Sequence, residues 1–178
     1  ITATQTLALA GADSTIIIGG VTNVLQMPAT GGSSSVALPY ETVLGDTATD
    51  IVTLTQTQGT TLAVQLLETL IGTAQNDVVV RIGTVGSTML VGQVETYIGN
   101  VGADVVQYAA GTTSMAFTAV ETIIGSASGD DVVTWAASGY TIAVDGIETV
   151  IGTAGANVIT DTGTTGGTIR VSLLESVA

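Results

Sequence analysis

Acidic side chains recur along this chain at a fixed spacing, and they are the residues best placed to do chemistry. One series recurs at intervals of about 27 residues and consists of Asp50, Asp77, Asp104, Asp131 and Asn157. A second series has the same spacing and consists of Glu41, Glu68, Glu95, Glu121, Glu148 and Glu175. Carboxylate oxygens suit Ca²⁺, but Asp and Asn side chains also accept backbone N–H bonds in turns. The Asp series therefore indicates either a row of calcium sites or a set of capped chain bends.

These residues belong to a repeat whose clearest copy is ETLIGTAQNDVVV, from Glu68 to Val80. A fixed period of this length is the signature of a repeat architecture. Each unit has three short apolar segments with period-2 alternation, which predicts strands. Inward columns are expected at Leu62, Met89, Met115, Ile142 and Ile169, and at Val64, Val91, Phe117, Val144 and Val171. A glycine closes each E-T-x-I/L segment, at a bend expected to need positive φ.

The pattern predicts an all-β fold, a right-handed parallel β-solenoid with three short strands and about 27 residues per coil, and about 6.5 coils. Residues 1–178 form a single domain, with an irregular first coil over 1–35 and regular coils over 36–178. The rival fold is an antiparallel β-sandwich, which explains the alternation but not the period.

Stacked coils would align residues of equal phase into ladders. Carboxylates in such a ladder lie about 5 Å apart and repel by about 1 kcal/mol per contact in water. The chain has no lysine to neutralise them, so bound cations or N–H bonds from the bends would have to do so. For the glutamates we expect a solvated edge or an intermolecular contact.

The bends carry a family resemblance. GNVGADVVQ (Gly99 to Gln107) and GTAGANVIT (Gly152 to Thr160) resemble the calcium-binding nonapeptide G-G-x-G-x-D-x-U-x of hemolysin-type (RTX) repeats, in which U is a large apolar residue. The second glycine of that motif is absent here, and the motif recurs once per sequence unit rather than in tandem. The resemblance implies a β-roll of an exported bacterial protein, with Ca²⁺ at Asp50, Asp77, Asp104, Asp131 and Asn157.

The composition of the chain argues against several classes of partner and function. A net charge of −13 argues against nucleic acid and anionic membranes as partners. No apolar run approaches the roughly 18 residues of a membrane span. The chain has no His, Cys or Lys to contribute to a nucleophile–base pair, which argues against an enzyme. Ice binding would need two outward threonine columns, and the column Thr53, Val80, Gln107, Thr134 and Thr160 is mixed.

Apolar residues at outward positions indicate self-association. Counting outward from the glutamates predicts an exposed stripe of Val43, Leu70, Tyr97, Ile123 and Val150, with a second at Ile51, Val78, Val105, Val132 and Val158. Leu173 and Leu174 lie in a C-terminal stretch that stays in repeat phase without a polar cap. We expect copies of the chain to associate end to end or laterally, as a structural subunit of an extracellular or cell-surface bacterial filament or surface layer. The alternative is a calcium-binding segment of a large RTX-like adhesin or exoprotein.

Overall fold

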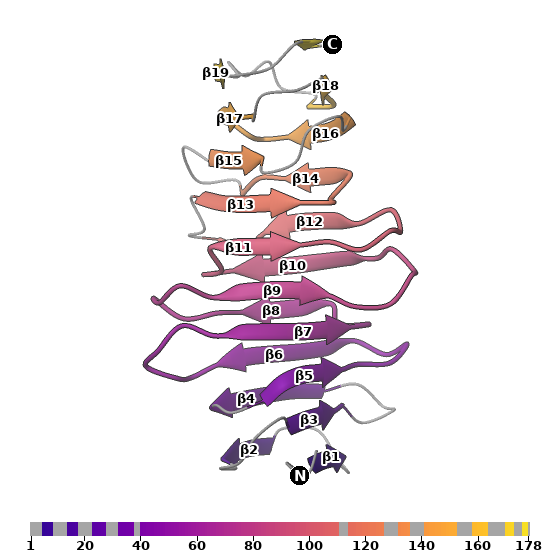
Figure 1. The fold of residues 1–178 in the computed structure, drawn as a ribbon, viewed down its shortest axis with the longest axis vertical. Helices are drawn as coiled ribbons and strands as arrows, with labels where there is room; N and C mark the ends of the chain where they lie inside the picture. The colour runs from indigo at the N-terminus through magenta and orange to yellow at the C-terminus, as the bar shows by residue number, and fades with distance from the viewer. Residues whose placement is uncertain are drawn as a thin grey trace, which may run out of the picture.

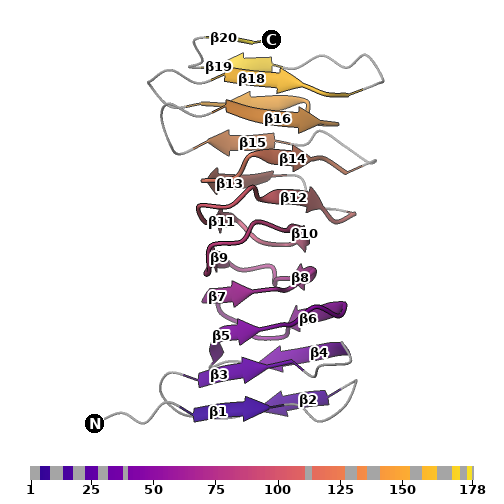
Figure 2. The ribbon, with the colours of Figure 1, turned by 90° about the vertical axis from the view of Figure 1, so that its right-hand side faces the viewer.

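The computed structural model describes residues 5–8, 14–17, 23–27, 32–37, 40–110, 114–126, 132–135, 141–152, 158–163, 170–172 and 176–177. These residues form two parallel β-sheets of ten strands each, stacked into a tall solenoid with its termini at opposite ends (Figures 1 and 2). The predicted all-β parallel solenoid is therefore confirmed. The described part of the chain contains no helix that is both long and apolar enough to span a membrane.

The odd-numbered strands form one sheet, here called sheet A, and the even-numbered strands form sheet B. Sheet A contains β1 (Gln5–Ala8), β3 (Asn23–Gln26), β5 (Tyr40–Leu44), β7 (Thr61–Gln65), β9 (Val78–Arg81), β11 (Thr96–Ile98), β13 (Ser114–Thr118), β15 (Val132–Trp135), β17 (Thr149–Ile151) and β19 (Arg170–Ser172). Sheet B contains β2 (Ser14–Ile17), β4 (Gly32–Ala37), β6 (Asp50–Leu54), β8 (Thr69–Ile71), β10 (Thr88–Gly92), β12 (Val105–Tyr108), β14 (Thr122–Ile124), β16 (Thr141–Asp145), β18 (Val158–Asp161) and β20 (Ser176–Val177).

One coil consists of two strands, because the chain alternates strictly between the sheets. Thr61 in β7 pairs with Val78 in β9, and Val78 pairs in turn with Thr96 in β11, so each return to the same sheet takes one short coil. The predicted coil, which has three strands and the length of a whole sequence unit, is therefore wrong. The sequence unit does hold three strands, such as β7, β8 and β9, but these complete one and a half coils. Successive units consequently start in opposite sheets.

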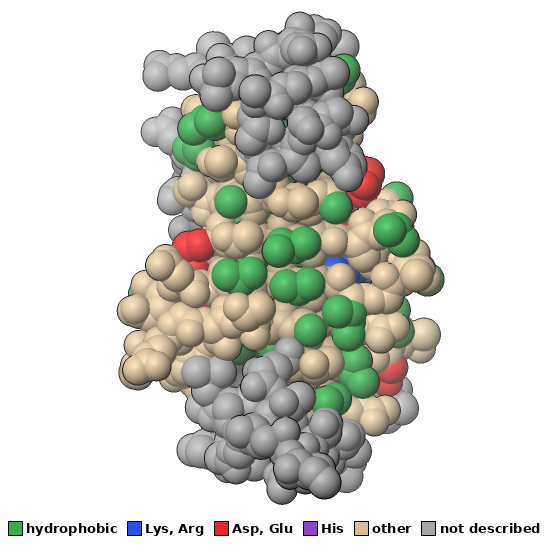
Figure 3. Space-filling model, viewed as in Figure 1, with side chains coloured by type: hydrophobic (Ala, Val, Ile, Leu, Met, Phe, Trp, Pro, Cys, Tyr) green, Lys and Arg blue, Asp and Glu red, His purple; other side chains and the backbone are tan. Residues whose placement is uncertain are grey.

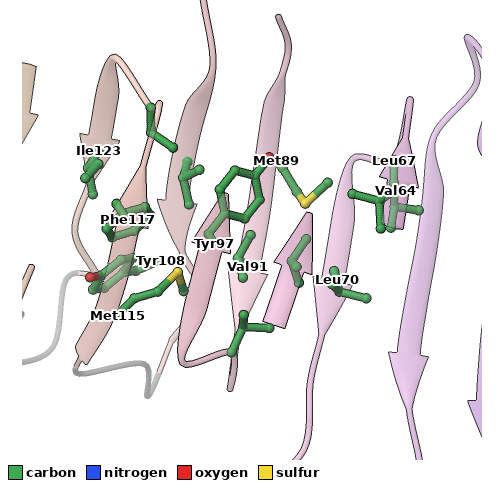
Figure 4. Packing of buried hydrophobic residues seen from close by; sticks show 14 of the residues in the cluster. Val64, Leu67, Leu70, Met89, Val91, Tyr97, Tyr108, Met115, Phe117 and Ile123 are labelled. Carbon is green, nitrogen blue, oxygen red and sulfur yellow. The ribbon is translucent and has the colours of Figure 1, made fainter. Parts of the chain in front are cut away.

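The core is a narrow layer between the sheets, filled by alternate residues of each strand (Figure 4). Both sets of residues predicted to point inward are confirmed to do so where side chains are described, since Leu62, Met89, Met115 and Ile142, then Val64, Val91, Phe117 and Val144, are all buried. The members of each set alternate between the two sheets, so they do not stack as the predicted columns. Aromatic rings thicken the middle of this layer, with the Phe117 ring 6.4 Å from that of Tyr97 and 6.1 Å from that of Tyr108. Apolar residues of different types stack from strand to strand, as Leu62, Val79 and Tyr97 do in sheet A, and they bury a continuous interior that no single coil could enclose.

Candidate functional site

The predicted Asp residues lie where the chain turns from one sheet to the other. We call residues 45–50, 72–77 and 99–104 the acidic corners, since each runs from a glycine to Asp50, Asp77 or Asp104. All three Asp side chains are completely buried. Asp131 and Asn157 lie outside the described residues. A buried carboxylate needs partners, so its surroundings decide what each corner can do.

Asp77 is held entirely by hydrogen-bond donors. Its Oδ2 accepts bonds from the backbone N–H of Thr73 at 2.7 Å and from the Thr73 hydroxyl at 2.8 Å. Its Oδ1 accepts the N–H of Thr60 at 2.9 Å, from the coil before. One side chain therefore closes its own bend and ties that bend to the preceding coil.

Asp104 repeats this arrangement, and Asp50 repeats the bond within its own bend. The Oδ2 of Asp104 accepts the N–H of Asn100 at 2.7 Å, and the Oδ2 of Asp50 accepts the N–H of Asp46 at 2.9 Å. The Oδ1 of Asp104 lies 3.4 Å from the N–H of Ser87 in the preceding coil. These contacts match the expectation of a capped bend.

The next coil adds a glutamate to each acidic corner. These glutamates end the tight corners, which we define as residues 66–68, 93–95 and 119–121. The N–H of Asp50 donates to Glu68 Oε2 at 2.8 Å. Asp77 and Asp104 donate in the same way to Glu95 and Glu121, both at 2.7 Å.

A second hydrogen bond runs in the opposite direction between the same residues, since the N–H of Glu95 donates to the Asp77 carbonyl at 3.1 Å. Hydrogen bonds between an Asp and a Glu that are 17 or 18 residues apart thus link adjacent coils.

The predicted ladders of equal-phase carboxylates do not form. Because one sequence unit makes one and a half coils, Asp50 and Asp77 lie on opposite edges of the solenoid. Asp50 and Asp104 share an edge but are three coils apart, about 14 Å at the usual strand spacing. The glutamates alternate between edges in the same way. The structure pairs each Asp with a Glu of the next coil, not with another Asp.

This geometry does not fit the calcium ladder that the resemblance implies. Around Asp77 the neighbouring groups are N–H and O–H donors, whereas Ca²⁺ is bound by oxygen atoms that offer lone pairs. Among the described residues no group of three or more His, Cys, Asp or Glu side chains converges as a metal site would require. Calcium binding at these corners would need the caps to open.

A backbone contact, not positive φ, selects the corner glycines. A Cβ atom on Gly72 would lie 2.0 Å from the carbonyl oxygen of Gln93, and one on Gly99 would lie 1.8 Å from that of Ala119. Among the described non-glycine residues, positive φ angles occur in the tight corners instead, at Leu66, Gln93 and Ala119, with values of 51° to 52°. The predicted reason for these glycines is therefore wrong, although the predicted requirement for glycine stands.

Short polar residues after the corner glycines were missed as functional positions. Asp46 Oδ1 accepts the N–H of Ala48, and Asn100 Oδ1 accepts the N–H of Gly102, both at 2.6 Å. Thr73 Oγ1 accepts the N–H of Gln75 at 3.2 Å. These side chains fold the backbone over, as Asn, Asp, Ser and Thr do in turns. The signal was present in the sequence, where the same position reads Asp46, Thr73, Asn100, Ser126 and Thr153.

The predicted interface stripe lies in the core. Val43, Leu70, Tyr97, Ile123 and Val150 are at most 1% exposed, and Figure 4 shows Leu70, Tyr97 and Ile123 among the core residues. The count went wrong because it started from a glutamate taken to point outward, but Glu68 lies in a corner and bends over the preceding coil. Leu173 and Leu174 lie outside the described residues. The residues of the second predicted stripe, from Ile51 to Val158, are half-buried at all five positions and so reach the surface. They alternate between sheet B and sheet A, however, so the predicted single stripe does not form.

Arg81 forms a buried polar cluster that the sequence analysis did not predict. It is 4% exposed, and its Nε lies 3.1 Å from Oδ1 of Asp104. Its Nη1 donates to the Tyr97 hydroxyl at 3.4 Å, and its Nη2 donates to Ser87 Oγ. Burial raises the pKa of Tyr97 above its ordinary value, and Arg81 opposes that rise. The position of Arg81 in the sequence unit did indicate its burial, because the same position of the neighbouring units holds Leu54 and Tyr108, which are also buried.

Comparisons with protein-family models, with curated proteins and with solved structures find no match to this chain. The function must therefore be argued from the solenoid itself.

Proposed function

We infer that this chain is a structural, self-associating subunit of an extracellular bacterial filament or surface layer. The observation that carries this proposal is the open stacking of the two parallel sheets, whose strand order runs in one direction and does not close on itself. In the described structure, β1 and β2 pair only with β3 and β4, and β19 and β20 pair only with β17 and β18. A strand paired on one side offers its remaining N–H and C=O groups to another chain.

The parallel arrangement makes such pairing head-to-tail. The last coil of one copy would meet the first coil of the next with every strand running in the same direction, which gives an open contact that extends into a fibre. Right-handed winding is part of the proposal, because parallel β crossovers are right-handed in nearly all proteins. Strand addition of this kind takes its affinity from main-chain hydrogen bonds.

The acidic corners support a structural role. Asp77 and Asp104 are buried and bonded to backbone donors, so their carboxylates serve the fold. The chain also has no His, Cys or Lys to act as a catalytic nucleophile or base. An extracellular bacterial setting follows from the RTX-like bends and the absence of cysteine, and it belongs to the proposal.

Negative-stain electron microscopy of the purified chain tests this function, first with chelator and then with millimolar Ca²⁺. Fibres under both conditions are the expected result. Fibres or folded particles only with Ca²⁺ would favour the alternative, a calcium-binding segment of an RTX-like adhesin or exoprotein. Folded single particles under both conditions would contradict the filament.

An edge variant sharpens the test. Ser176 and Val177 in β20 pair with Val158 and Ile159 of β18. Amide groups alternate in direction along a strand, so one of these two residues directs its N–H to the free side. Proline at that residue removes a donor needed for strand addition but leaves the β18 pairing intact. Of Ser176→Pro and Val177→Pro, one is expected to shorten fibres without unfolding the chain.

A further inference from the structure

We propose that the outer face of sheet A is a second contact surface, which pairs face to face with the same face of another copy. This inference deepens the proposed function and rests on it for the identity of the partner. The contact is lateral and is distinct from end-to-end strand addition. We define the sheet A face by its outward-pointing residues between Thr42 and Ile151.

The centre of the sheet A face is a continuous aliphatic patch. Ala63 pairs with Val80, and Val80 pairs with Ile98, on the successive strands β7, β9 and β11. Val78 lies beside Val80, and Ala116 on β13 lies one strand beyond Thr96. All these aliphatic side chains are half-buried, so they are partly open to solvent within one copy. In Figure 3 hydrophobic side chains run up the middle of this face.

Charge is confined to the margins of the solenoid. Every acidic side chain that the structure describes belongs to a corner or to the first or last residue of a strand. The acidic side chains that are visible in Figure 3 lie at the two edges of the face. No outward position of sheet A from Thr42 to Ile151 carries a charged residue. Sheet B has Asp145 on its outward side, at the end of β16.

This charge distribution identifies a second copy as the partner. The net charge is −13, so two copies that approach edge to edge repel each other. The neutral faces are the surfaces on which they can meet. A basic partner would be drawn to the acidic edges and would leave the sheet A face uncovered. Since the same flat face serves both copies, the contact is isologous and closes at two chains.

The size of the sheet A face suits a weak pair. Its seven strands, about 4.8 Å apart with roughly four residues each at about 3.3 Å, cover about 440 Å². Two such faces bury about 900 Å² in total, just below the roughly 1,000 Å² expected of a specific interface. The contact is therefore weak for an isolated pair, and fibres that align many copies would add many such contacts.

The repeat supplies a matched control. Ile98 and Ile151 close the three-residue strands β11 and β17 in sheet A, and Ile71 and Ile124 close β8 and β14 in sheet B. All four occupy the same position of the sequence unit and point outward. Because Ile124 pairs with Asp145, a glutamate at that position would face a second carboxylate. The single variants Ile98→Glu and Ile71→Glu therefore make the same chemical change on opposite faces.

Sedimentation velocity over a range of protein concentrations and at two salt concentrations tests the inference, with circular dichroism to verify folding. Wild type should pair reversibly, and more strongly at high salt because the acidic edges are screened. The sheet A variant should weaken pairing about tenfold or more, because it buries unpaired carboxylates, while the sheet B variant should pair like wild type. If both variants unfold, Ile98→Ser and Ile71→Ser replace them, with the weaker pairing again expected only for Ile98→Ser.

Three results would overturn the inference. The first is a wild type that stays monomeric at high concentration, and the second is loss of pairing in the sheet B variant alone. The third is open-ended growth that the sheet A variant leaves unchanged, which would keep the filament but remove the lateral contact. Conversely, a closed pair with no longer fibres would retain this inference and contradict end-to-end assembly.

Discussion

A single carbonyl oxygen fixes the residue type at each corner glycine. The chain of the next coil passes so close that the carbonyl of Gln93 takes the space in which a side chain on Gly72 would stand. The N–H of Gly72 also donates to the carbonyl of Gly92 at 2.7 Å. Contact between coils, and not the conformation of the bend alone, therefore excludes every other residue.

Gly72→Ala should lower the free energy of unfolding by about 3 kcal/mol, because overpacking against backbone cannot be relieved by a rotamer change. Urea denaturation measures the loss. Gly83→Ala is the control: Gly83 has a φ of 96°, but its nearest neighbour is the flexible Gln65 side chain at 3.3 Å. Its loss should be about 1–2 kcal/mol, the strain of a left-handed residue. An equal or smaller loss for Gly72→Ala would contradict the close approach.

The buried Tyr97 hydroxyl predicts alkaline destabilisation. Burial raises the folded-state pKa of Tyr97 above its ordinary 10.0. Above about pH 10 the unfolded chain therefore loses a proton that the folded chain still holds, and stability falls as the pH rises. The slope should approach about 1.4 kcal/mol per pH unit between the two pKa values.

Urea midpoints at about pH 8 and pH 10.5 measure this slope. Tyr97→Phe has a lower baseline stability, because Arg81 Nη1 loses its acceptor, but its slope should be shallower. Equal slopes for the two proteins would exclude Tyr97 as the source.

The sequence predicted which residues recur at these corners but not what they touch. Glycine and Asp were visible as columns because their positions repeat. Their partners, such as Gln93 for Gly72, lie farther along the chain in a neighbouring coil. Arg81 was harder still. Its position in the repeat indicates burial, but its cluster with Asp104, Tyr97 and Ser87 occurs in one unit, so no repeated pattern predicts those partners.

At the scale of elements, the acidic corners that end in Asp77 and Asp104 each link three coils. Asp77 accepts an N–H from Thr60 in the coil before and donates its own N–H to Glu95 in the coil after. Backbone groups that a bend would otherwise leave buried and unpaired are thereby satisfied. The corner side chains thus continue, beyond the strand ends, the hydrogen bonding that the strands provide within each sheet.

Asp77→Asn should destabilise the fold by about 2–4 kcal/mol, because the amide NH₂ would face N–H donors at one of the two oxygen positions. Glu95→Gln is the matched control, since the Gln oxygen can still accept the N–H of Asp77, and about 1 kcal/mol is expected. Both are measured by urea denaturation with chelator and with Ca²⁺. A smaller effect for Asp77→Asn than for Glu95→Gln would contradict the cap, and a wild-type gain in Ca²⁺ that Asp77→Asn abolishes would identify a metal role.

Alternation predicted the strands well where they are long and failed where they are short. In five-residue strands such as β7 the alternation of inward and outward side chains is clear, and Leu62 and Val64 were correctly predicted to point inward. The three-residue strand β8 offers too few residues to set its own phase, so the phase was taken from Glu68. That glutamate belongs to a corner, which moved Leu70 to the wrong face.

At the scale of the whole molecule, the period of the sequence and the period of the coil differ. A sequence unit of about 27 residues on a coil of about 18 residues returns to the same edge after two units and three coils. Each edge therefore stacks three kinds of corner in turn, with an acidic corner always beneath a tight corner. Sequence similarity alone gives the length of a unit, and it cannot show how many turns of the chain that unit makes.

The chain should accordingly tolerate the deletion of one sequence repeat better than the deletion of one coil. Deletion of residues 42–68 joins Glu41 to Thr69, removes one full sequence repeat and moves every later strand to the opposite sheet. Each remaining corner keeps a neighbour of the right kind, so this longer deletion should fold.

The matched control removes one coil instead. Deletion of residues 42–59 keeps every later strand in its sheet, but the tight corner 66–68 loses the acidic corner on which it rests. This shorter deletion should be less stable than the longer one by about 3 kcal/mol or more, because Glu68 and several backbone groups lose their partners. Circular dichroism and urea denaturation compare the two, and greater stability of the shorter deletion would show that the coil, rather than the order of its corners, holds the solenoid together.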